Sequence, residues 1–210
     1  SQDHYDMLLG GLSMGVGYSK SFYNLFVPVS YRVVNYLDKD LLAQLKIEPK
    51  VDISLDDALL SLNTKYSQKS YKPSEYKVLD DTSYGAGAGY YYIKGADFLY
   101  LKFLYEKVLA DDPNSVFIDR DMFTLSGGLN YVFLDSLISR VDYKYRHGSY
   151  DDNSYTTAQN REDNYQQLDL KLSYYFSKIM ELYVSNKYID NSSNNDQSDY
   201  TKNVVMFGLS

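Results

Sequence analysis

The residues of this sequence that could carry out catalysis are two histidines and the serines near one of them. His147 lies close to Ser139 and Ser149, and a histidine beside a serine can act as general base for a nucleophilic hydroxyl, as in a barrel lipase. Neither His147 nor His4 stands in the spacing of a catalytic or metal-binding motif, and the chain has no cysteine. We therefore predict no catalytic residue, no metal ligand, no cofactor and no enzymatic activity.

Three carboxylates, Asp142, Asp169 and Glu181, could form a pair of catalytic acids. Each of them has a lysine or an arginine nearby in the sequence. Opposite charges at such short spacing favour ion pairing over acid-base catalysis. The charged residues therefore indicate a polar surface, whose position depends on the secondary structure.

Glycine alternates with other residues in two segments, residues 7–18 and 84–93. The second segment lacks the lysine and the following helix that a phosphate-binding loop requires, so we interpret it as a strand. Glycines on one face of a strand can relieve curvature or bulge strain in a closing sheet. The alternative is that they leave space for a plug, a loop or a cargo molecule.

The composition combines a low mean hydropathy of -0.43 with 25 tyrosines and 9 phenylalanines in 210 residues. A lipid-water interface suits tyrosine, because the ring can lie in the apolar layer while the hydroxyl stays hydrated. The net charge of -7 argues against a protein that binds nucleic acid through its phosphates. These features favour a membrane protein that has no nucleic-acid partner.

The main structural signal is an alternation of apolar and polar side chains with a period of two. Residues 137–147 put Val141 and Tyr143 on one face and Arg140 on the other, and residues 168–176 alternate in the same way. The strands predicted from this alternation are residues 7–18, 23–33, 42–53, 58–69, 84–93, 99–107, 123–133, 137–147, 168–176, 182–189 and 203–209. No run of residues approaches the roughly 20 apolar positions of a membrane helix, so any membrane-spanning form must be a closed sheet of about eleven strands.

The predicted connections alternate between tight and long. The tight ones lie near residues 19–22, 55–57, 94–97, 133–136 and 176–179. The long, polar ones are residues 70–79, 109–118, 148–163 and 190–200, with only the link at 37–40 short. Short turns on one side and long loops on the other are typical of outer-membrane barrels. We therefore predict an all-β, antiparallel up-and-down transmembrane β-barrel that spans the bacterial outer membrane many times.

Alternation alone does not decide which face points outward, because a soluble barrel or sandwich shows the same pattern. The number of consecutive strands, the meander connections and the tyrosines near strand ends favour an apolar face in contact with lipid and a polar face around a hydrated lumen. The residues predicted to line the lumen are Arg32, Lys46, Glu48, Lys50, Asp52, Lys65, Lys102, Glu106, Arg140, Asp142, Lys144, Arg146, Asp169, Lys171, Glu181 and Lys187.

The number of strands also predicts how complete the barrel is. With eleven strands, the first and the last run in the same direction, whereas bacterial barrels close antiparallel with an even number of strands. We therefore expect residues 1–210 to form a single barrel domain that is truncated upstream. The parent barrel would have about 12 to 14 strands.

The segments NYQQLDLKLSYYF and ELYVSNKYIDNSSNNDQSDYTKNVVMFGLS, together with YNLFVPVSYRVV, resemble the barrel domain of surface lipoprotein assembly modifier (Slam) type proteins. The resemblance extends over nearly the whole chain. It implies a barrel of about fourteen strands, preceded by a periplasmic helical-repeat domain. It also implies that lipoproteins or other protein cargo would be partners, in addition to outer-membrane lipid.

Three functions fit these observations. The first is a polar passage for the export or surface display of protein cargo, and the second is a general diffusion porin. The third is a barrel enzyme or an adhesion scaffold. The sequence immediately before Ser1 would distinguish the first two, because helical repeats there favour export and further strands favour a porin.

Overall fold

The computed structural model describes residues 7–36, 39–112, 119–150, 160–177, 179–195 and 198–209. Twelve strands form one antiparallel sheet: β1 (Met7–Lys20), β2 (Tyr23–Tyr36), β3 (Lys39–Ile47), β4 (Lys50–Leu55), β5 (Ala58–Tyr71), β6 (Asp81–Lys94), β7 (Asp97–Ala110), β8 (Arg120–Leu134), β9 (Leu137–Tyr150), β10 (Glu162–Ser177), β11 (Met180–Ser193) and β12 (Tyr200–Leu209). A short 3-10 helix, η1 (Ser74–Leu79), follows β5. None of the helices in these ranges is long and apolar enough to cross a membrane.

Strands that follow one another in the chain lie side by side in the sheet, apart from β3 and β4. These two occupy a single position, because both pair with β2 on one side and β5 on the other. Pro49 separates them, and proline has no N–H to donate to a ladder. The sheet therefore has eleven strand positions, as predicted, but the strand predicted at residues 42–53 is interrupted.

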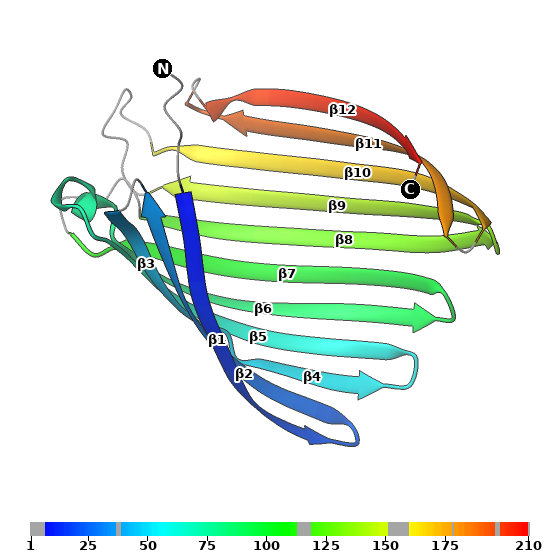
Figure 1. The fold of residues 1–210 in the computed structure, drawn as a ribbon, viewed down its shortest axis with the longest axis horizontal. Helices are drawn as coiled ribbons and strands as arrows, with labels where there is room; N and C mark the ends of the chain where they lie inside the picture. The colour runs from blue at the N-terminus through cyan, green and yellow to red at the C-terminus, as the bar shows by residue number, and fades with distance from the viewer. Residues whose placement is uncertain are drawn as a thin grey trace.

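The two ends of the sheet differ in the length of their connections (Figure 1). Tight turns join β1 to β2, β4 to β5, β6 to β7 and β8 to β9 at one end, and Gly95 in one of them has a φ of 63° that favours glycine. At the other end, the connection after β5 contains η1, and the connections after β7, β9 and β11 are also longer than the tight turns. This confirms the predicted alternation, although β9 and β10 reach further into the residues 148–163 that were predicted as a loop.

The apolar face of the sheet is exposed. Leu101 is 53% exposed, Phe103 42% and Leu172 42%. Tyr143 and Leu170, which also lie on the apolar face of their strands, are exposed as well. Among the described residues, the only buried apolar side chains are those of Ala43 and Val108. A soluble barrel would instead bury its apolar side chains in a dry core. An apolar surface of this extent needs a lipid environment, which excludes the soluble alternative.

The outer edges of β1 and β12 pair with no other strand in the part of the chain that is described. Each step across the eleven positions is antiparallel, so β1 and β12 run in the same direction. Direct pairing of these two edges would be parallel. The expectation that further strands precede this chain stays a prediction.

Candidate functional site

A cavity of about 500 Å³ lies on the polar face of the sheet. Its lining comes from every strand from β5 to β10, from Ser61 on β5 to Asp169 on β10. In a flat sheet, strands five positions apart would be separated by about 24 Å. Side chains of β5 and β10 can line one cavity because the sheet curves around it, so the polar face is the concave one.

Most of the residues predicted to line the lumen meet one another on this face. Twelve of the sixteen form six ion pairs: Lys46–Glu48 at 2.7 Å, Lys50–Asp52 at 2.8 Å, Lys65–Glu106 at 2.8 Å, Arg140–Asp142 at 2.5 Å, Lys171–Glu181 at 2.6 Å and Lys187–Asp169 at 3.6 Å. The remaining four are Arg32, Lys102, Lys144 and Arg146. The charges are therefore largely interleaved, as expected for cations and carboxylates on one wall.

On the polar face, the Asp142 carboxylate accepts hydrogen bonds from two side chains. The Tyr100 hydroxyl donates to Asp142 Oδ1 at 2.6 Å, and Arg140 Nε donates to Asp142 Oδ2 at 2.5 Å. Tyr100 on β7, Gly128 on β8 and Asp142 on β9 lie at one level of the sheet. The ring of Tyr100 crosses over Gly128 to reach Asp142. This is possible because glycine has no side chain, and a Cβ at this position would collide with the ring. Tyr100 belongs to the polar parity of its strand, but sequence reasoning did not single it out.

The inward glycines make room for neighbouring side chains of this chain itself. A Cβ at Gly89 would lie 3.0 Å from the ring of Tyr91, and one at Gly15 would lie 2.6 Å from the ring of Phe26. Gly85 lies between Lys65 and Glu106 in the register, so these two side chains can form their ion pair across β6. Side chains from neighbouring positions therefore occupy this space, which neither interpretation of the sequence anticipated.

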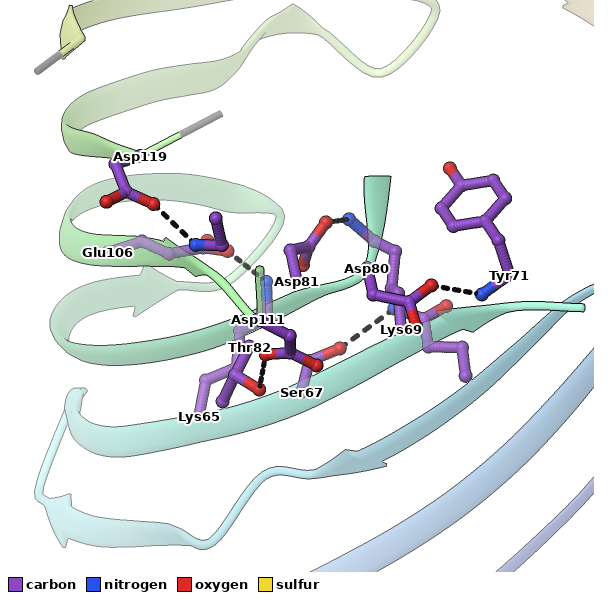
Figure 2. A network of polar contacts seen from close by, with 12 residues as sticks. Lys65, Ser67, Lys69, Tyr71, Asp80, Asp81, Thr82, Glu106, Asp111 and Asp119 are labelled. Carbon is purple, nitrogen blue, oxygen red and sulfur yellow. Dashed lines mark hydrogen bonds and ion pairs between the residues drawn. The ribbon is translucent and has the colours of Figure 1, made fainter. Parts of the chain in front are cut away.

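A second polar network lies at the long-loop end of β5, β6 and β7 (Figure 2). Lys69 Nζ lies 2.8 Å from Asp81 Oδ2, and the Asp81 side chain is buried. Asp80 Oδ1 accepts a hydrogen bond of 2.6 Å from the backbone N–H of Tyr71, and Thr82 donates to Asp111 at 2.9 Å. These contacts tie the loop after β5 to the ends of the strands. The sequence placed Lys69 at the last position of a strand and Asp81 beyond the next loop, so their pairing was not predicted.

On the polar face, the cations Lys102, Lys144 and Arg146 lie near aromatic rings. Lys102 Nζ is 4.8 Å from the ring centroid of Tyr100 and 5.3 Å from that of Tyr91. Arg146 is 5.0 Å and Lys144 5.9 Å from the ring centroid of Tyr165. A ring face attracts a cation but does not neutralise its charge.

The candidate catalytic residues His147, Ser139 and Ser149 all lie on β9. His147 Nδ1 lies 3.0 Å from Asn164 Oδ1, and the register pairs His147 with Asn164 and Phe123. No group of three or more metal-binding side chains occurs among the described residues. His4 lies outside those residues.

Comparison with known proteins supports an outer-membrane barrel. A family model described as "Putative beta-barrel porin 2" matches residues 120–210, less than half of the chain. No curated protein sequence matches the chain. The resemblance to Slam-type proteins is not confirmed by these findings.

Solved structures of outer-membrane proteins share the fold at low sequence identity. In-vitro folded OmpT, an outer membrane protein of Vibrio cholerae, is 10% identical with a TM-score of 0.54, over 98% of this chain and 92% of that chain. A BenF-like porin from Pseudomonas fluorescens Pf-5 is 11% identical with a TM-score of 0.57, over 94% of this chain and 58% of that chain. OccAB3 of Acinetobacter baumannii is 12% identical with a TM-score of 0.57, over 95% of this chain and 55% of that chain. Together with the exposed apolar face, these likenesses show a porin-like β-barrel fold that crosses the outer membrane many times.

Proposed function

We propose that this porin-like outer-membrane β-barrel forms the wall of a hydrated passage for small hydrophilic solutes. The observation that carries the proposal is the curvature of the sheet, which puts the charged face around a cavity and the apolar face outside. In a barrel of this width, the concave face is the lumen. The sixteen charged residues predicted from the sequence would then line the passage.

The ion pairs on this face support a wet interior. The lysine side chains of the Lys46, Lys50 and Lys171 pairs are 35%, 41% and 38% exposed. A dry lumen would impose a large desolvation cost on so many charges, whereas water in a passage keeps them solvated. The cavity volume is in the range that accommodates a small molecule.

Export or surface display of protein cargo, the first expectation from the sequence, rests on the Slam resemblance. Its partners would be a lipoprotein or other protein cargo and a periplasmic helical-repeat domain. The curved wall with a cavity of small-molecule size favours solute passage over export. His147 and Ser139 stand on one strand about 26 Å apart, too far for a base and its nucleophile, and His147 instead contacts Asn164.

Neutralising Arg140, Lys144 and Arg146 together to glutamine should shift the ion selectivity of the passage towards cations. The change removes Lys144 and Arg146, which have no carboxylate partner among the residues that the structure describes, and it leaves Asp142 without its arginine. Reversal potentials in planar bilayers under a KCl gradient should show a severalfold fall in the chloride-to-potassium permeability ratio. The charge-retaining variant Arg140→Lys with Arg146→Lys should stay close to wild type.

The same measurement tests the passage itself. A wild-type barrel that folds in the bilayer but carries no current would contradict a solute passage. That outcome would favour a plugged export barrel or a scaffold.

A further inference from the structure

We infer that Lys102 and Lys144, with Ser126 between them, form a subsite that binds the carboxylate or phosphate group of a small anionic solute. This subsite rests on the proposed function, because it would lie on the polar face along which the solute moves. It assigns a solute class to a passage that could otherwise carry neutral or cationic molecules.

The register of three adjacent strands puts these side chains in a row. Lys102 on β7 is paired with Ser126 on β8, and Ser126 is paired with Lys144 on β9. All three line the same cavity. The Cα atoms of the two lysines are two strand spacings apart, about 10 Å. An oxyanion between them can accept hydrogen bonds from both ammonium groups and from the Ser126 hydroxyl.

These two lysines differ from most cations on the wall in having no carboxylate partner within the described residues. Lys102 contacts the rings of Tyr91 and Tyr100, and Lys144 contacts the ring of Tyr165. A cation–π contact at an exposed site is weak and leaves the N–H donors of the ammonium group free. These ring contacts therefore leave the charge of both ammonium groups available to a ligand.

The carboxylates that line the same cavity are already engaged. Asp142 accepts hydrogen bonds from Arg140 and Tyr100, and Asp169 lies 3.6 Å from Lys187. Asp142 is two residues from Lys144 on β9, and Asp169 is paired with Asp142 on β10, so both carboxylates lie beside the row and not in it. Their charges are balanced by their own partners, so Lys102 and Lys144 leave an excess of positive charge at the row. The chain as a whole carries a net charge of -7, so this excess is a local feature.

A neutral sugar is the main competing ligand, because Tyr91 and Tyr100 form a nearly parallel ring pair with an interplanar angle of 29°. Sugar rings would need to stack on the open faces of these two side chains. The ammonium group of Lys102 lies over both rings. This position favours an anion over a stacked sugar.

The double variant Lys102→Gln with Lys144→Gln tests the subsite. In planar bilayers, sodium phosphate and sodium succinate should each reduce the chloride current of the wild-type protein, whereas sucrose at equal concentration should not. The double variant should need at least fivefold more of either anion for the same reduction. A response to phosphate alone or to succinate alone would identify which group the subsite prefers.

Two control variants separate the subsite from general electrostatics. Lys20→Gln with Lys94→Gln removes the same charge at the tight-turn end of β1 and β6 and should respond as wild type does. Lys102→Arg with Lys144→Arg keeps the charge and should retain the response. An equal reduction by sucrose, or an unchanged response in the glutamine double variant, would overturn the subsite while leaving the passage intact.

Binding to the barrel in detergent gives a readout that needs no current. Equilibrium dialysis with radiolabelled phosphate and succinate should show binding to the wild-type protein that the glutamine double variant loses. A barrel without current that still binds would contradict the passage and support the subsite. Absence of binding in dialysis would overturn the subsite.

Discussion

Leu170→Arg is expected to destabilise the barrel in lipid vesicles by about 2 to 4 kcal/mol, the cost of a basic side chain near the midplane of the lipid-facing surface. Leu170 lies on the apolar face of β10, is 39% exposed, and has Val141 and Asn186 beside it on the neighbouring strands. A charge at this position would face lipid tails. Denaturant titration of the folded fraction in liposomes measures the loss.

The matched variant is Lys171→Leu, one residue further on the opposite face. Lys171 lies 2.6 Å from Glu181, so its loss removes an ion pair on the polar wall, but Glu181 also accepts a hydrogen bond of 2.5 Å from Ser173. We expect an effect below about 1 kcal/mol, the usual range for a half-exposed ion pair. Equal losses for the two variants would contradict the assignment of the two faces.

Gly128→Ala should destabilise the barrel by about 1 to 3 kcal/mol, the usual cost of overpacking. The added Cβ would collide with the ring of Tyr100 and lie 2.5 Å from Asp142 Oδ1. The ring must then leave Gly128 and give up its hydrogen bond to Asp142. The same liposome titration measures the loss, and Gly10→Ala is the control, because nothing lies within 4 Å of a Cβ at Gly10.

A double-mutant cycle isolates this contact. If Tyr100 is first replaced by alanine, Gly128→Ala should cost much less, with a coupling energy of about 0.5 to 3 kcal/mol. Additive losses, or a cost of Gly128→Ala no larger than that of Gly10→Ala, would show that the ring does not lie where the structure puts it.

The alternation of side chains predicts most of this fold because it is local. Each strand needs only its own residues to define two faces, so eleven strand positions and the polar parity of Arg140 and Lys171 follow from the sequence. Pro49 is a local signal as well, because a proline interrupts a ladder of backbone hydrogen bonds. The prediction of one continuous strand over residues 42–53 overlooked this proline.

The contacts within the site could not be predicted in the same way, because they depend on register between strands. Lys65 and Glu106 are 41 residues apart and meet across Gly85 on the strand between them. Likewise, Lys102 and Lys144 come into one row only through Ser126. The sequence can identify a glycine face, but it does not say which neighbouring side chains will fill the space that the glycines leave.

If the alternating faces of these strands separate lipid from a hydrated lumen, single cysteines on β10 should differ in their reactivity from one residue to the next. The chain has no cysteine of its own, so each substitution at residues 168–172 introduces a single thiol. In liposomes, a water-soluble thiol reagent should modify cysteines at Asp169 and Lys171 and leave those at Leu168, Leu170 and Leu172 unmodified. Modification of the leucine positions in preference to the charged ones, or equal modification of all five, would contradict the assignment of one face to lipid and the other to the lumen.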